Sequence, residues 1–153
     1  MRQNRLRKLL EDGKPSIGHH VVSTSPDVVE IIGRVGGVDY LEFVAEYMPY
    51  DLHGLDNFGR ALELTGMSGM IKVDQENKAF TAGRALGSGL QNILFSDTRT
   101  ADEAQACVES VRAETPQTGG KHGAADRRFA GFGLESGGVD YVQALDDSVI
   151  ALM

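Results

Sequence analysis

Three side chains that could do chemistry stand where predicted strands end. Lys72 lies near the end of the apolar segment "MIKV", and Glu46 and Tyr47 follow "YLEFVA". A lysine ammonium attracts an anion, a glutamate accepts a proton or a hydrogen bond, and a tyrosine hydroxyl donates one. Tyrosine has an ordinary pKa of about 10, far from that of a neutral base, so we expect Tyr47 to line the site mainly as a donor. Lys72, Glu46 and Tyr47 are therefore the predicted catalytic residues.

Two further strands end in polar residues. His19 and His20 in "SIGHHVVST" alternate across a strand, so only one of them can face the site, and we expect it to be His20. The same geometry makes the two histidines a poor metal chelate. Ser96 and Asp97 end "LQNILFSD". We predict that His20, Lys72, Ser96 and Asp97 contact the substrate.

An alternating series of strands and helices has to position these residues. Apolar residues recur with helical spacing in some segments and form short β-type runs in others, with glycines between them. Ser25 and Thr100 stand at predicted helix starts, and residues 115–138 are expected to be irregular. The predicted strands are residues 16–24, 40–46, 69–74, 90–97 and 149–153, and the predicted helices are residues 4–11, 26–36, 51–66, 78–89, 100–114 and 139–148.

This alternation predicts an α/β fold of parallel strands joined by right-handed crossovers. Two architectures fit: an open doubly wound sheet, or part of a (β/α)₈ barrel. The spacing of the units does not decide between them. The sequence contains neither G-x-G-x-x-G after the first strand nor G-x-x-x-x-G-K-[ST]. Five strands complete an open sheet, whereas a whole barrel needs about 250 residues.

The composition narrows the class of protein. The chain has 153 residues and a formal net charge of −7. Nucleic acid is an unexpected partner for an acidic chain, because phosphate binding needs a basic patch. No apolar run approaches the roughly 20 residues of a membrane span. The single cysteine, Cys107, is expected to be a buried helix residue, and it fits a reducing cytoplasm.

An ordered series of segments resembles one known family. The segments are "NRLRKLLEDGKPSIG", "SPDVVEIIGRVGGVDYLEFVAEYMPYD", "LDNFGRALE", "MIKV", "RALGSGLQNILFSDTRTADEA" and "DSVIALM". Together they resemble the HpcH/HpaI aldolase/citrate lyase family over essentially the whole chain. The resemblance implies a (β/α)₈ barrel assembled into trimers or hexamers. It also implies metal-dependent cleavage of 4-hydroxy-2-oxo acids to pyruvate, or a similar oxo acid, and an aldehyde.

The resemblance carries roles to individual positions, with several departures. Glu46 of the family's D-x-E-H segment is kept, but Tyr47 stands where the family has its base histidine, and Val44 where it has the partner aspartate. Lys72 replaces an arginine that steadies the enolate, and lysine lacks the planar guanidinium fork. His20 falls near an aromatic or polar site position. The family's R-G-x-G segment matches Lys121-His122-Gly123-Ala124, again with lysine for arginine.

The expected metal ligands lie outside this sequence. The resemblance implies a divalent cation, Mg²⁺ or Mn²⁺, held by a glutamate and an aspartate beyond Met153. Residues 1–153 are therefore expected to be the N-terminal part of a single barrel, truncated at strand five and inactive alone. Two hypotheses remain open. One is a metal-dependent carbon–carbon lyase acting on a 2-oxo acid, and the other is a non-catalytic, oligomeric half-barrel with a binding or structural role.

Overall fold

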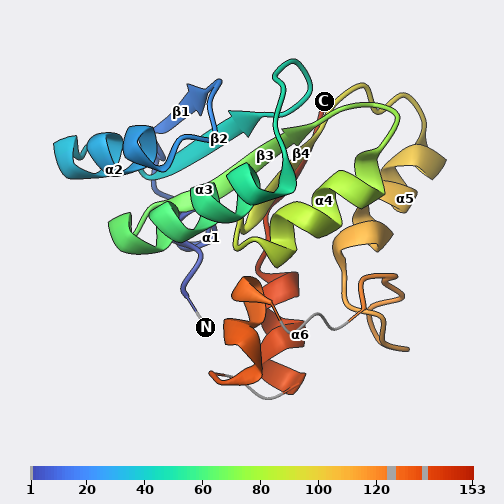
Figure 1. The fold of residues 1–153 in the computed structure, drawn as a ribbon. Helices are drawn as coiled ribbons and strands as arrows, with labels where there is room; N and C mark the ends of the chain where they lie inside the picture. Colours follow the sequence, from blue (N-terminus) through green and yellow to red (C-terminus); the bar gives the residue numbers. More distant parts are fainter. Residues whose placement is uncertain (1, 124–126, 136–137) are drawn as a thin grey trace.

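A five-stranded parallel sheet organises the chain in a computed structural model, which describes residues 2–123, 127–135 and 138–153. The strand order follows the chain, β1-β2-β3-β4-β5, and every neighbouring pair is parallel (Figure 1). The strands are β1 Gly18–Val21, β2 Tyr40–Val44, β3 Ser68–Val73, β4 Asn92–Phe95 and β5 Ile150–Leu152. The predicted alternating α/β fold is thereby confirmed.

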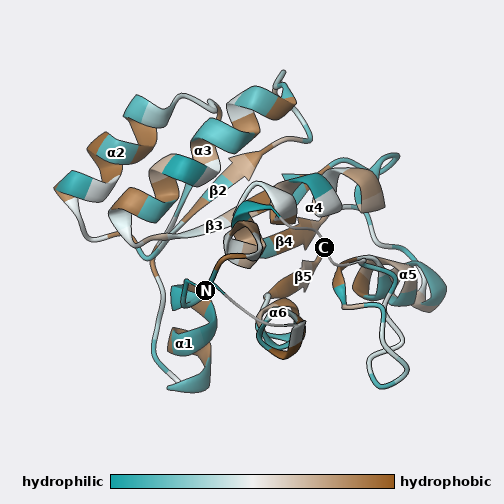
Figure 2. Ribbon diagram, turned by 60° about the horizontal axis from the view of Figure 1, so that its bottom comes forward, coloured by the Kyte–Doolittle hydropathy of each residue, from teal (hydrophilic) through white to brown (hydrophobic). Residues whose placement is uncertain are grey.

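Helices connect the strands, and α2 to α5 lie along one side of the sheet (Figure 1). The helices are α1 Arg5–Glu11, α2 Pro26–Val35, α3 Leu52–Thr65, α4 Lys78–Gly87, α5 Ala101–Val111, α6 Gly138–Asp146 and the 3₁₀ helix η1 Arg128–Gly133. Their polar sides face outward while the central strands are largely apolar (Figure 2). The helices therefore cover one face of the sheet.

Capping residues start three of these helices. The side chains of Asn4, Asp51 and Thr100 accept hydrogen bonds from backbone N–H groups in the first turns of α1, α3 and α5. Thr100 is thus confirmed as a cap. Ser25 occupies the predicted position before Pro26, but its side chain makes no capping bond. Proline removes one backbone donor from that turn, which lessens the need for a cap.

Alternate strand residues form the core. Leu41, Phe43, Ile71 and Phe95 are fully buried against the apolar sides of the surrounding helices. The opposite, inner face carries the residues of the other parity. These are Tyr40, Glu42 and Val44 from β2, Ser68, Met70 and Lys72 from β3, and Asn92 and Leu94 from β4. Polar and charged side chains are therefore concentrated on the inner face.

Asn4 ties the N-terminal helix to the ends where strands begin. Its amide donates to Oδ1 of Asn92 at 2.7 Å and to the carbonyl of Asp147 at 3.0 Å. Its own oxygen accepts from the Ser68 hydroxyl at 3.0 Å. Because Asn4 and its two side-chain partners are buried, this network fixes α1 beneath the sheet.

The structure corrects the sequence prediction at several boundaries. The predicted strands 16–24, 90–97 and 149–153 are shorter, since they include flanking loop residues. The segment 115–138 was predicted to be irregular, but it contains η1. Arg127 and Arg128 anchor this segment to α3: Arg127 contacts both carboxylate oxygens of Asp56, at 2.6 and 2.7 Å, and Arg128 pairs with Glu63 at 2.7 Å. Long-range ion pairs of this kind leave no local sequence pattern.

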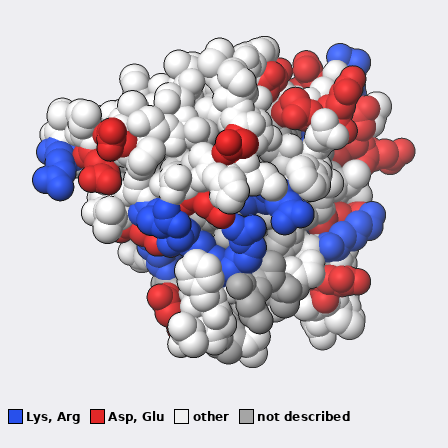
Figure 3. Space-filling model, in the orientation of Figure 1, with Lys and Arg blue, Asp and Glu red and all other residues white. Residues whose placement is uncertain are grey.

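The surface carries both signs of charge. On the face shown in Figure 3, Lys and Arg side chains gather across the middle, and Asp and Glu side chains gather at the upper right. Cys107 is a buried helix residue, as expected. Within the described ranges, the helices are too short or too polar to cross a membrane.

Candidate functional site

Lys72, Glu46 and Tyr47 meet at the edge of the sheet where the strands end. The ammonium of Lys72 lies 2.5 Å from Oε2 of Glu46. It also lies 4.9 Å from the centroid of the Tyr47 ring, a cation–π distance. The side chains of Lys72 and Glu46 are only 11% and 13% exposed. The structure therefore brings the three predicted catalytic residues together.

Strand register explains this meeting. Val44 pairs with Lys72, and just beyond the strand the backbone N–H of Glu46 donates to the carbonyl of Lys72 at 3.2 Å. The chain of β2 is thus held against β3 at the position of Lys72. The Glu46 carboxylate can then reach the ammonium without a long loop.

The surroundings keep Lys72 charged. Contact with the Glu46 carboxylate raises the pKa of Lys72 above its ordinary value of 10.5, because the negative partner favours the protonated form. Partial burial acts in the opposite direction but is outweighed. At neutral pH the site therefore presents a fixed cation. An ammonium has three N–H donors, so Lys72 can face Glu46 and an anionic ligand together.

Tyr47 is 65% exposed, so it forms an accessible wall of the site. Its ring face covers the ammonium, which favours the positive charge. The predicted role as a hydrogen-bond donor to substrate stays a prediction.

His20 lies deeper along the sheet and faces Glu42, a residue that sequence reasoning missed. Nδ1 of His20 is 3.0 Å from Oε1 of Glu42, and their side chains are 70% and 7% exposed. Within the described residues, Oε1 of Glu42 accepts no hydrogen bond, although the His20 imidazole lies within ion-pair distance of it. A charged residue inside the apolar run "YLEFV" was the available signal, since glutamate is rarely buried without a partner.

Ser96 and Asp97 lie differently from one another. Ser96 is fully buried, and its hydroxyl donates to the carbonyl of Val73 at 2.5 Å. This hydrogen bond joins β3 to the end of β4, and the predicted contact of Ser96 with substrate stays a prediction. Asp97 is exposed at the same edge and has a positive φ of 53°. Its predicted contact with substrate stays a prediction.

The segment matched to R-G-x-G lies near the end of α5. Lys121 pairs with Glu109 at 2.6 Å and is 71% exposed, and His122 pairs with Ala113 in an isolated bridge. Ala124 lies outside the described residues. No three His, Cys, Asp or Glu side chains within the described ranges are grouped so that they could hold a metal ion. The described residues therefore do not fit the divalent cation that the resemblance implies.

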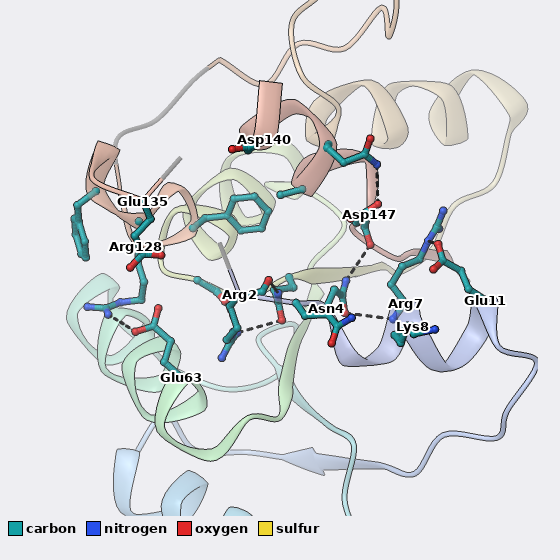
Figure 4. A pocket seen from close by; sticks show the side chains of 18 residues that line it. Arg2, Asn4, Arg7, Lys8, Glu11, Glu63, Arg128, Glu135, Asp140 and Asp147 are labelled. Carbon is teal, nitrogen blue, oxygen red and sulfur yellow. Dashed lines mark hydrogen bonds and ion pairs between the residues drawn. The ribbon is translucent and has the colours of Figure 1, made fainter. Parts of the chain in front are cut away.

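A large cavity of about 730 Å³ lies at the opposite, N-terminal end of the strands. Arg2, Arg7 and Lys8 line it together with Glu63, Asp140 and Asp147 (Figure 4). Arg2 donates to the carbonyl of Gly89 at 2.9 Å, so much of its bonding supports the chain itself. Barrel enzymes carry their chemistry at the C-terminal ends of the strands. For that reason the Lys72 edge, and not this cavity, is the candidate site.

Comparisons with known proteins bear on the fold of the chain. An HpcH/HpaI aldolase from Desulfitobacterium hafniense DCB-2 superposes with a TM-score of 0.84 at 21% identity, over 98% of this chain and 56% of that chain. An HpcH/HpaI aldolase/citrate lyase family protein from Burkholderia cenocepacia J2315 gives 0.84 at 25% identity, over 98% and 59%. No family model matches the chain.

A curated relative is similar at the level of sequence. The 4-hydroxy-2-oxovalerate aldolase of Novosphingobium aromaticivorans is 27% identical over 129 residues, which are 84% of this chain and 49% of that protein. The chain thus spans about half the length of the curated relative it matches. The resemblance to HpcH/HpaI aldolases is confirmed, and the five strands correspond to an incomplete (β/α)₈ barrel.

Proposed function

We propose that this chain is the N-terminal part of a carbon–carbon lyase that cleaves a 2-oxo acid by aldolase chemistry. The observation that carries the proposal is the protonated Lys72, held beside Glu46 at the C-terminal edge of the sheet. The similarity to a protein named 4-hydroxy-2-oxovalerate aldolase supports the same reaction class. The substrate is then a small 2-oxo acid, and pyruvate is the expected oxo-acid product.

The charge of Lys72 suits this reaction. Cleaving the bond between C3 and C4 of a 4-hydroxy-2-oxo acid leaves an enolate whose negative charge rests largely on the C2 oxygen. A cation fixed before the reaction stabilises such a developing charge without reorganising. Lys72 serves as this cation or as the anchor of the substrate carboxylate. Glu46 and Tyr47 hold the ammonium in place and complete the wall.

The divalent cation belongs to the proposal through the family resemblance. Since the described residues do not hold it, its ligands are proposed to come from residues beyond Met153. A bound Mg²⁺ or Mn²⁺ would act as a Lewis acid on the oxo acid.

The outer strands of the sheet support a second proposal about assembly. Among the described residues, β1 and β5 are the outer strands, and each pairs with a neighbouring strand on one side alone. Ile17, Val22 and Met153 are 60%, 63% and 60% exposed beside these edges. Exposed strand edges and apolar side chains favour association, so the 153-residue chain alone is proposed to be an inactive homo-oligomer.

Pyruvate proton exchange tests the lyase proposal. The product of the complete reading frame is incubated with pyruvate and Mg²⁺ or Mn²⁺ in D₂O, and loss of the methyl proton signal is followed by NMR. We expect metal-dependent exchange, slowed in Lys72→Met, and cleavage or condensation with one of a panel of aldehydes. Absence of exchange with every metal would refute it. For the second proposal, sedimentation of residues 1–153 as a stable 16.5 kDa monomer would contradict association.

A further inference from the structure

The inner face of the sheet carries a histidine–carboxylate pair that the site described above does not use. Glu42 is nearly buried, and Oε1, one of its two carboxylate oxygens, lies 3.0 Å from Nδ1 of His20. The His20 side chain is 70% exposed even though this nitrogen faces a buried carboxylate. The opposite edge of the ring, with Nε2, is therefore the accessible part.

Strand register places His20 and Lys72 on the same face. His20 pairs with Glu42, and two residues further along β2, Val44 pairs with Lys72. Residues two apart in a strand point to one side, and paired residues in a parallel sheet share that side. His20, Glu42 and Lys72 thus face a common space. His19 has the opposite parity and pairs with the core residue Leu41.

The separation suits a small substrate. Two strand spacings separate β1 from β3, so Lys72 is displaced from His20 by about 10 Å across the sheet. Along the strand direction, Lys72 lies about 7 Å nearer to the C-terminal edge. In the proposal, a three-carbon oxo acid lies between them, with its oxygens toward Lys72 and its methyl group toward His20.

We propose that His20 is the proton-transfer residue of this site and that Glu42 is its positioning residue. This inference rests on the proposed lyase function. Histidine is the side chain best suited to exchange protons near neutral pH. The Glu42 carboxylate lies 3.0 Å from Nδ1 and favours the tautomer with its proton on that nitrogen, which leaves Nε2 as the basic nitrogen. A buried carboxylate orients an imidazole in this way in other proton-transfer sites.

The proton balance of the cleavage is complete with this pair. Nε2 of His20 takes the proton of the C4 hydroxyl, and the oxygen electrons form the aldehyde carbonyl. The bond between C3 and C4 breaks, and its electrons form the C2–C3 double bond of the enolate beside Lys72. The imidazolium then returns its proton to C3, which gives the methyl group of pyruvate.

The pair also supplies what this chain lacks at the end of β2. Tyr47 and Val44 stand where the family resemblance places a histidine and an aspartate. The His20–Glu42 pair supplies a histidine from the neighbouring strand β1 and a carboxylate from β2 itself, two residues before Val44. Tyr40 packs beside this pair's strands, since a Cβ on Gly18 would lie 2.1 Å from Cζ of the Tyr40 ring. The ring therefore lies against β1 where glycine leaves room.

The ionisable groups around the pair come from two neighbouring strands. Tyr40 shares the inner face with Glu42, and burial followed by the Glu42 charge raises the pKa of the Tyr40 hydroxyl, which stays neutral. Lys72, paired with Glu46, is the cation of the same face on β3. The Lys72–Glu46 ion pair thus lies at the C-terminal edge of the inner face, and the His20–Glu42 pair lies below it.

Pyruvate exchange by variants tests the pair in the product of the complete reading frame with Mn²⁺. His20→Ala should lower the exchange rate by about 10²- to 10⁴-fold, and added imidazole should restore part of it because the position is open to solvent. Glu42→Gln should cause a smaller loss that imidazole does not restore. His19→Gln is the matched control on the opposite face and should leave the rate unchanged. Circular dichroism melting confirms that each variant is folded.

The outcomes separate the two proposals. Exchange by the unmodified protein that persists in folded His20→Ala would overturn the role of His20 and leave the lyase proposal standing. A loss that imidazole does not restore, with pyruvate binding also lost, would make His20 a structural residue and likewise overturn the inference. No exchange by the unmodified protein would end both proposals.

Discussion

The ion pair between Lys72 and Glu46 should stabilise the fold measurably, although it lies at an open edge. At 2.5 Å the two charges attract by about 7 kcal/mol with an effective dielectric constant of about 20. Removing both charges from water offsets most of this attraction. Because the side chains are only 11% and 13% exposed, we expect a net coupling of about 1–3 kcal/mol, above the range of exposed pairs.

A double-mutant cycle measures this coupling. Urea unfolding is compared for the unmodified protein, Lys72→Met, Glu46→Gln and the double variant. Lys72→Met alone should lower the free energy of unfolding by about 2–3 kcal/mol, because it leaves the Glu46 carboxylate without its partner. The double variant should lose less than the sum of the two single variants.

An exposed pair provides the matched control. Lys121 and Glu109 lie at a similar distance, 2.6 Å, but Lys121 is 71% exposed. The cycle of Lys121→Met and Glu109→Gln should give a coupling near the limit of detection. If the Lys72 cycle gave no larger coupling than this control, water would screen the pair fully, and the account of a fixed cation at the site would be refuted.

Three further predictions concern stability. The pKa of Lys72 is raised above 10.5 in the folded protein, so the contribution of its charge to the free energy of unfolding should be fully present below pH 10.5 and lost at higher pH. Urea unfolding of the unmodified protein and of Lys72→Met at alkaline pH would reveal this loss. Gly59→Ala places a Cβ 1.8 Å from the Ser88 carbonyl oxygen and should lower the free energy of unfolding by about 3 kcal/mol or more. The Cβ of Gly83→Ala meets nothing closer than 3.7 Å, so this variant should stabilise α4 by about 0.5–1 kcal/mol. Thermal melting distinguishes the two variants. Asn4→Ala removes four hydrogen bonds, two of them buried and one of them the cap of α1, and should cost about 2–3 kcal/mol in the same assay.

The sequence alone indicated the alternating elements and most of the candidate site. The placement of Lys72, Glu46 and Tyr47 at strand ends was predictable because parallel strands deliver their C-terminal ends to one edge. The parity of His19 and His20 was also predictable, since side chains alternate along any strand. The choice between an open sheet and a barrel was not, because both use the same local periodicity.

Tertiary structure decided which side chains meet. Glu42 and His20 are 22 positions apart, and no local pattern shows that their strands pair in the register that joins them. Ser96 shared the strand-end signal with Asp97, yet the close approach of β3 and β4 buries its hydroxyl against Val73. Local sequence fixes the direction in which a side chain can point. Register and packing between distant segments fix what it finds there, because those contacts arise only when the whole sheet forms.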